Sequence, residues 1–257
     1  MDILRKELNA IYDSQHLSDE ILDNCEIQRY KHIIESLASV SDALYVITDA
    51  LADHCYIYSG SLARLLGLTS EPQYCTEQNS SDEEVIYSRI HPADLVEKRM
   101  LEYEFFKFVN PLSASEKKTY VATSRFRIKF YKGQYIYVDN STQVLHPSPC
   151  GKIWLILCKY AISPDQKPTD DIQAAIICTA TGAIKRFSFT QDKCRILTAR
   201  EKEIMTLIMN GNLSKQIAAI LGISVNTVNR HRQNIISKLS VNNSAEAISA
   251  AISMKLL

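Results

Sequence analysis

The stretch that decides the fold runs from Leu197 to Leu239 and reads LTAREKEIMTLIMNGNLSKQIAAILGISVNTVNRHRQNIISKL. Thr198 and Glu201 form the pattern of a capping box, in which both side chains satisfy free amides of a first helical turn. Asn210-Gly211 predicts the end of that helix, because glycine readily adopts the left-handed conformation found just past a helix. A first helix is therefore expected between these two signals.

Two further helices are predicted on either side of the short turn Gly222–Ser224. Apolar residues at helical spacing precede the turn, and Ser224 is a suitable N-cap for a helix that runs to about Leu239. Two helices joined by a short turn with glycine form a helix-turn-helix. Ser244 is the predicted cap of a fourth helix, which completes an all-α four-helix domain over 197–257.

The third helix of this domain has two unlike faces. Its apolar stripe, within about 80° of arc at 100° per residue, consists of Val225, Val228, Ile235 and Leu239. Asn226, Arg230, Gln233 and Ser237 point the opposite way, flanked by Asn229 and Asn234, and no acidic residue lies between 204 and 239. Arginine pairs with guanine, and asparagine or glutamine with adenine, whereas phosphates repel carboxylates. The face is thus predicted to read base edges; the alternative is a polar face without a ligand.

The last 61 residues resemble the LuxR family of regulators at more than twenty positions in order. The matching residues are Leu197-Thr198, Arg200-Glu201, Glu203-Ile204, Gly211, Lys215, Ile217-Ala218, Leu221, Ile223-Ser224, Thr227-Val228, His231, Asn234-Ile235, Lys238-Leu239, Val241, Asn243 and Ala245-Glu246-Ala247. The resemblance implies that the third helix enters the major groove of double-stranded DNA and that the fourth helix often dimerises. It places base reading on Asn229, Arg230 and Gln233, to which the polar face adds Asn226. Phosphate contacts are expected from Lys215, Ser224, Thr227 and Lys238.

Two positions depart from the family pattern. Asn229 stands where the family commonly has lysine, so the usual operator preference is not assumed. Leu213-Ser214 stands where serine or threonine followed by asparagine is common, which predicts that Ser214 caps the second helix one position later.

The charge of the chain is divided unevenly. Residues 197–257 hold seven Lys or Arg against three Asp or Glu, a net of +4, and residues 1–196 carry the complementary −4. A basic domain attached to an acidic body is typical of a nucleic-acid-binding module. The composition, 46% hydrophobic and 23% charged, is that of a soluble globular protein. We expect no membrane association, because no apolar run approaches the roughly 20 residues of a span.

The seven cysteines, at positions 25, 55, 75, 150, 158, 178 and 194, form no Cys-x-x-Cys pair. Their spacing predicts reduced thiols in a cytoplasmic protein and no metal site. We find no glycine-rich phosphate loop, nucleophile elbow or His-Glu-x-x-His motif, so no catalytic residue is predicted.

The N-terminal region resembles a PAS domain over 25–162. The expected elements are a helix over Cys25–Ser41, a hairpin of Leu44–Asp49 and Cys55–Ser59, a short helix over Leu62–Leu68, a helix from Ile90-His91-Pro92-Ala93-Asp94 to about Val109, and β-rich runs over Tyr120–Tyr131, Gln134–Leu145 and Lys152–Ala161. An antiparallel sheet with helices on one side gives an α+β fold that encloses a small pocket. Residues 163–196 are assigned to a linker with an additional hairpin, and 1–24 to a helical segment.

The apolar stripe of the N-terminal segment, Ile3 or Leu4 with Leu8 and Ile11, either packs on the sheet or forms a dimer contact. PAS domains bind flavin, haem or small metabolites. The surroundings of Cys75 do not match a flavin-photoadduct motif, and none of His32, His54, His91 and His146 is favoured as a haem ligand; His91 is expected to cap its helix. No cofactor is predicted, and an unidentified small molecule is the candidate ligand.

Together these features predict a one-component transcription regulator that acts as a homodimer, with RNA polymerase as a further candidate partner. Two alternatives stay open. In one, the same DNA reader carries an N-terminal domain that only mediates association. In the other, the N-terminal region is an enzyme, against which the missing nucleophile–base motif argues.

Overall fold

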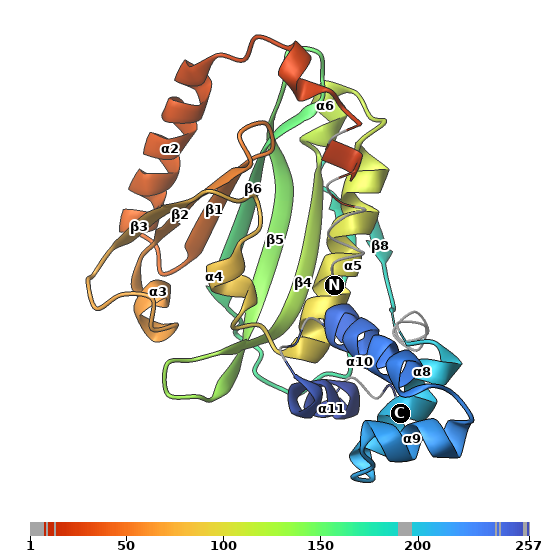
Figure 1. Cartoon of the computed structure of the whole chain (residues 1–257). Helices are drawn as coiled ribbons and strands as arrows, with labels where there is room; N and C mark the ends of the chain where they lie inside the picture. The colour runs from red at the N-terminus through yellow and green to blue at the C-terminus, as the bar shows by residue number, and fades with distance from the viewer. Residues whose placement is uncertain are drawn as a thin grey trace. The chain divides into compact units, whose positions relative to one another are not determined.

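The computed structural model describes residues 8, 10–12, 14–189, 197–239, 241, 243–253 and 256. The chain divides into two compact units (Figure 1), one containing Glu7–Phe187 and the other containing the C-terminal residues from Ser188 onward. The first is built on an antiparallel sheet with helices, and the second is helical. The predicted α+β class is therefore confirmed.

The N-terminal unit contains one eight-stranded antiparallel sheet, with strand order β3-β2-β1-β6-β5-β4-β7-β8. The strands are β1 Leu44–Asp49, β2 His54–Ser59, β3 Tyr74–Gln78, β4 Tyr120–Lys129, β5 Tyr135–Pro147, β6 Ile153–Ile162, β7 Ala175–Cys178 and β8 Ile184–Arg186. The predicted hairpin β1–β2 and the three long strands β4–β6 are all present. Gly133, at the tip of the β4–β5 connection, has φ 86°, the left-handed conformation that favours glycine in a tight turn.

Helices lie against both faces of this sheet. They are η1 Leu17–Asp19, α2 Asn24–Ser39, α3 Ser61–Leu65, α4 Glu84–Tyr87, α5 Pro92–Val109 and α6 Ala114–Lys117. Ile27 and Ile34 of α2 share a buried cluster with Tyr45 and Ile47 of β1, which places α2 on what we call the outer face. On the inner face, the Lys98 ammonium of α5 lies 5.8 Å from the centre of the Tyr160 ring. Successive residues of a strand point to opposite faces, so both faces of the central strands are covered there.

The entry into α5 follows the prediction. The His91 side chain accepts a hydrogen bond from the Ala93 amide at 3.3 Å, and Pro92 is the first helical residue. Proline suits this position, because its missing N–H would lack an intrahelical partner anyway. His91 is therefore an N-cap.

The segment that we assigned to a linker belongs largely to the N-terminal unit. The Ser163 amide donates to the Tyr137 carbonyl, and the Thr169 amide donates to the Tyr137 hydroxyl. β7 then pairs with β4 from Tyr120↔Cys178 to Thr123↔Ala175, so the predicted hairpin extends the main sheet. The predicted boundary at 162 is wrong, because composition identifies a polar, proline-containing segment but not its hydrogen-bond partners.

The N-terminal stripe is only partly described, because Ile3 and Leu4 lie outside the described residues. Leu8 is buried, and the Tyr12 ring packs edge-on against Phe106 of α5, with 5.6 Å between ring centres. The residue that follows this stripe thus packs against α5 of the N-terminal unit, and a dimer contact through the stripe itself stays a prediction.

The C-terminal unit consists of α8 Ala199–Met209, α9 Ser214–Leu221, α10 Val225–Leu239 and α11 Ser244–Ser253. Thr198 and Glu201 form the predicted capping box, and Gly222 ends α9 in the left-handed conformation with φ 64°. Val228, Ile235 and Leu239 of α10 are buried, as the apolar stripe predicts. The four predicted helices and the helix-turn-helix of α9 and α10 are present.

Two predicted caps are wrong. Ser214 is the first residue inside α9 and follows the N-cap position Leu213, whose amide donates to Gln216 at 2.7 Å. At α11 the cap is Asn243, which accepts from the Glu246 amide at 2.9 Å, and Ser244 is again the first helical residue. Serine is common at caps, and the sequence alone does not separate a cap from the position next to it.

Candidate nucleic-acid interface

The polar face of α10 is open to solvent. The side chains predicted to read bases, Asn226, Asn229, Arg230 and Gln233, are all exposed. On the other side of the helix Val228, Ile235 and Leu239 are buried. A helix of this kind fits the major groove, where its amide and guanidinium groups can pair with base edges. The arrangement brings together all four predicted base-reading residues on one free helix face.

The start of α10 is fixed by Ser224 and Thr227. The Thr227 amide donates to the Ser224 hydroxyl at 3.0 Å, which is the predicted N-cap, and the two hydroxyls lie 2.8 Å apart. Both residues are exposed. Their predicted role as phosphate contacts is geometrically open, because a hydroxyl that caps a helix can still meet a phosphate oxygen.

The two lysines predicted to touch phosphate differ in their surroundings. Lys215 is exposed in the first turn of α9. The Lys238 ammonium instead donates to the Glu201 carboxylate at 2.7 Å, and the Glu201 side chain is only 3% exposed. Burial raises the pKa of Glu201, but hydrogen bonds from Lys238 and Thr198 outweigh this and leave the pKa below its ordinary value. The geometry therefore gives Lys238 a structural partner that the sequence did not identify.

Two arginines that we did not select tie the helices together. Arg200 of α8 donates to the carbonyl of Leu221, the last residue of α9, at 3.0 Å. Arg232 of α10 donates to the hydroxyls of Ser214 at 3.2 Å and Ser244 at 2.9 Å. The sequence signal for Arg232 is its position within the arc of the apolar stripe, between Leu239 and Val225, which indicates contact with a neighbouring helix rather than with solvent.

The N-terminal unit contains a second cluster of chemically distinctive groups, between α4, α5 and β6. We call it the inner-face network; its members are Asp82, Glu83, Tyr87, Lys98, Arg99, Glu102 and Tyr160, all of them buried. The Lys98 ammonium donates to Glu102 at 2.6 Å and to the Tyr87 hydroxyl at 3.1 Å. Tyr160 donates to Glu83, and Arg99 pairs with Asp82. None of these residues was selected from the sequence, because Tyr160 of β6 lies far along the chain from α4 and α5, and charged residues on helices are ordinarily taken as solvated.

Burial and neighbouring charges act against each other in the inner-face network. It raises the pKa of the Glu83 carboxyl above its ordinary value, although Lys98 acts in the opposite direction. The pKa of Glu102 is lowered, because Lys98 and Arg99 outweigh the effect of burial. Two carboxyls in one space are thus driven in opposite directions, a pattern that is enriched at functional sites and also occurs in structural ion-pair networks.

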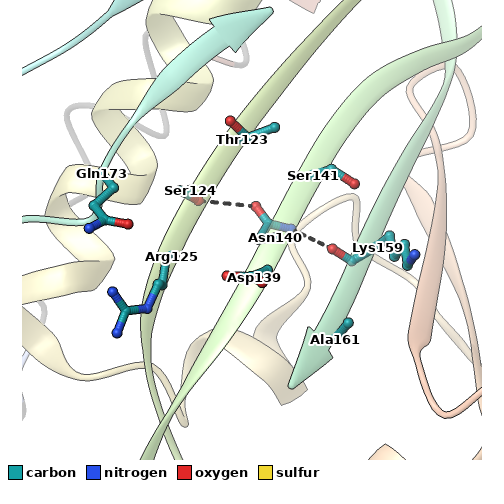
Figure 2. A pocket seen from close by; sticks show the side chains of 9 residues that line it. All are labelled: Thr123, Ser124, Arg125, Asp139, Asn140, Ser141, Lys159, Ala161 and Gln173. Carbon is teal, nitrogen blue, oxygen red and sulfur yellow. Dashed lines mark hydrogen bonds between the residues drawn. The ribbon is translucent and has the colours of Figure 1, made fainter. Parts of the chain in front are cut away.

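A separate groove of about 420 Å³ lies on the outer face of β4, β5 and β6 (Figure 2). It is lined by Thr123, Ser124, Arg125, Asp139, Asn140, Ser141, Lys159, Ala161 and Gln173. Figure 2 shows the Asn140 amide between the Ser124 hydroxyl, at 3.5 Å, and the Lys159 carbonyl, to which it donates at 3.1 Å. Charges of both signs border the groove, so it does not favour one class of ligand.

Within the described part of the chain, no group of three or more His, Cys, Asp or Glu side chains is arranged to hold a metal ion. The six described cysteines are free thiols, and Cys194 lies outside the described residues. None of the helices described is both long enough and apolar enough to cross a membrane.

Comparison with known proteins places the C-terminal unit in a family. The family model for "Bacterial regulatory proteins, luxR family" matches residues 195–251. The chain is 31% identical over 138 residues to the probable transcriptional regulatory protein SgaR of Hyphomicrobium methylovorum, covering 51% of this chain and 59% of that protein. It is 43% identical over 68 residues to the oxygen regulatory protein NreC of Staphylococcus carnosus, covering 26% and 31%. The chain thus spans less than two thirds of these relatives.

Among solved structures, VqmA of Vibrio cholerae is similar at 16% identity, with 88% of each chain covered and a TM-score of 0.30. SdiA of Escherichia coli is 14% identical, with 95% of this chain and 97% of that chain covered and a TM-score of 0.23. These scores are too low to establish a common fold. The family match, the four helices and the exposed polar face of α10 agree, and the C-terminal segment of this chain is a helix-turn-helix domain of the luxR family of regulatory proteins.

Proposed function

We propose that this protein is a transcription regulator that binds a specific double-stranded DNA site by inserting α10 into the major groove. The observation that carries the proposal is the exposed face of Asn226, Asn229, Arg230 and Gln233 on the second helix of a luxR-family helix-turn-helix. Lys215 and the capping pair Ser224 and Thr227 supply phosphate contacts at the helix starts. The proposal includes a homodimer in the cytoplasm and RNA polymerase as a further partner.

The direct test is selection of binding sites from random duplex DNA by the purified protein. We expect a defined consensus, and loss of that consensus in the double variant Arg230→Ala, Gln233→Ala. Unchanged site selection by the double variant, or no enriched site with the native protein, would contradict the proposal.

We infer that the N-terminal unit is a PAS-like input domain with no catalytic activity. The observation in favour is the inner-face network, since buried charged groups are costly and mark candidate functional sites. The rival is a unit that serves association alone. Burial raises the pKa of the Cys158 thiol well above its ordinary value, which makes it a poor nucleophile and argues against an enzyme built on it.

Native mass spectrometry of the purified full-length protein separates these roles. A small molecule bound at stoichiometric amounts to the native protein, and absent from the double variant Lys98→Met, Glu83→Gln, supports sensing. A dimer without added mass, unaffected by either substitution, supports association alone. We expect no flavin or haem absorbance, and a stoichiometric flavin or Soret band would contradict our interpretation of Cys75 and the histidines.

A further inference from the structure

We propose that Arg232 is a positioning residue that sets the distance between α10 and the first turn of α9, and thereby the contact of Lys215 with DNA phosphate. This inference rests on the DNA-binding function proposed above. It concerns a partly buried residue outside the predicted base-reading face of α10, and it follows from three features of the C-terminal unit.

The first feature is the double hydrogen bond of the Arg232 guanidinium. Its two terminal nitrogens donate to the hydroxyls of Ser214 and Ser244, which are the first residues of α9 and α11. A guanidinium is planar and presents its donors in a fixed fork. One side chain of α10 therefore holds the starts of two other helices, and the two serines serve as acceptors rather than as caps.

The second feature is the way in which α9 is held at its two ends. Its last residue, Leu221, accepts from Arg200 and leads through Gly222 into the turn before α10. Its first turn is held to α10 by Arg232, while Ile217 and Ala218 bury the apolar face between. Without Arg232 the first turn of α9 would keep its apolar packing but lose the hydrogen bond between Ser214 and α10.

The third feature is the place of Lys215, which follows Ser214 directly. It is exposed and lies in the turn that Arg232 holds. Base readers on α10 and a phosphate contact on α9 can act together only if the two helices keep a fixed spacing, since phosphate contacts set the register of a protein on the duplex. Arg232 supplies that link between them.

The positive charges at the starts of α9 and α11 give an electrostatic reason to expect DNA phosphate nearby. A helix N-terminus carries a partial positive charge, so a cation there is unfavourable in isolation. Arg232 lies at the starts of α9 and α11, and Lys215 adds a further charge at α9. Such an arrangement becomes favourable next to an anion, and the DNA backbone provides one.

The experiment is a double-mutant cycle between Arg232→Met and Lys215→Met in the full-length protein, with DNA affinity measured across a salt series. We expect each single variant to bind all sequences about five- to tenfold more weakly, with a salt slope shallower by about 1. In the Arg232→Met background, Lys215→Met should cost less than about twofold, because the phosphate contact has already been lost.

Variants that leave the net charge unchanged distinguish a positioning role of Arg232 from a direct effect of its charge on DNA binding. Ser214→Ala removes the α9 tie without changing charge and should reproduce the uniform weakening, whereas Ser244→Ala should affect it less. Arg232→Lys keeps the charge but places all its donors on a single nitrogen, so it should retain one of the two ties and keep more of the affinity than Arg232→Met does. Circular dichroism and thermal unfolding of each variant would identify a loss of fold, and the serine variants keep the test valid if Arg232→Met unfolds.

Three outcomes would overturn the inference. If the losses of binding free energy for Arg232→Met and Lys215→Met add in the double variant, Arg232 does not act through Lys215. Unchanged binding by Ser214→Ala would show that the tie does not matter. A native protein that selects no DNA site would instead remove the proposed function, and this inference with it.

Discussion

At the scale of single residues, base reading by α10 and phosphate contact by Lys215 of α9 should respond differently to substitution. Arg230→Ala and Gln233→Ala should each weaken binding to the preferred site by about 1–3 kcal/mol, because each removes a pairing with a base edge. Lys215→Ala should weaken binding to all sequences alike. Competition binding with specific and random duplexes measures both effects. Thr206→Ala on α8 is a control and should change neither; equal losses on both duplexes for Arg230→Ala would contradict its assignment.

Glu201 gives the C-terminal unit a predictable response to acid. Its pKa in the folded protein lies below the ordinary 4.5, so its stabilising contribution is complete above that pH and is lost as the pH falls through the folded-state value. Glu201→Gln keeps an acceptor for Thr198 but loses the ion pair with Lys238. We expect it to unfold with about 1–3 kcal/mol less free energy at pH 7, and with a smaller further loss toward pH 3.

Denaturant unfolding at a series of pH values, followed by helical circular dichroism, measures this difference. A Glu201→Gln variant whose stability falls with acid as steeply as that of the native protein would show that other carboxyls carry the effect. Glu203, which is about half exposed and pairs with Arg200 at 2.7 Å, is the matched control, and its glutamine variant should change little.

At the scale of elements, the inner-face network joins α4, α5 and β6 through buried charges. Lys98→Met should destabilise the N-terminal unit by about 3–5 kcal/mol, because it leaves the Glu102 carboxylate without its closest cation. Adding Glu102→Gln should recover part of the loss, since the unpaired charge is then removed as well. Thermal or denaturant unfolding of the two variants checks this; equal stability of Lys98→Met and the native protein would contradict it.

Most elements could be predicted from local patterns, and the failures have a common physical cause. Runs rich in apolar and β-forming residues identified β1, β2 and β4–β6, and the capping residues Thr198, His91 and Ser224 marked helix starts within a residue or so of their observed places. Pairing of β7 with β4 was missed, since it joins segments more than fifty residues apart. A sequence shows which residues suit a strand, but not which neighbour each strand finds.

In the candidate site too, some features follow from local patterns and others depend on how the helices pack. Exposure of Asn226, Asn229, Arg230 and Gln233 follows from helical periodicity alone. The partner of Lys238 and the two acceptors of Arg232 depend on how α8, α9 and α11 pack around α10, and no spacing along the chain shows that. The inner-face network was missed for the same reason, because charged residues on α4 and α5 are ordinarily taken as solvated.

At the scale of the whole molecule, charge and oligomeric state make opposite predictions about the DNA affinity of residues 195–257 relative to the full-length chain. We expect the full-length chain to bind a two-half-site duplex more tightly than residues 195–257 at every salt concentration, because a dimer links two readers. The half-sites should lie about 10 bp apart or a multiple of that, on one face of the duplex. Affinity measurements on both proteins across a salt series provide the test.

Tighter binding by residues 195–257 at low salt, with the difference closing as salt rises, would contradict that expectation. It would indicate instead that residues 1–196, with their net charge of −4, compete with DNA for the basic residues of 197–257. Equal affinities at all salt concentrations would leave no role for the N-terminal unit in DNA binding.

The pairing of β7 and β8 with β4 determines where this protein can be cut and rejoined. A truncation at 162 would remove two strands and leave β4 as a bare edge, with Val121 and Thr123 ready to pair with another chain and aggregate. A junction after Phe187 keeps the eight-stranded sheet whole. Chimaeras that exchange the C-terminal unit for a DNA-binding domain with a known operator should therefore keep residues up to 187 together, and expression from that operator would test the proposed sensing by the N-terminal unit.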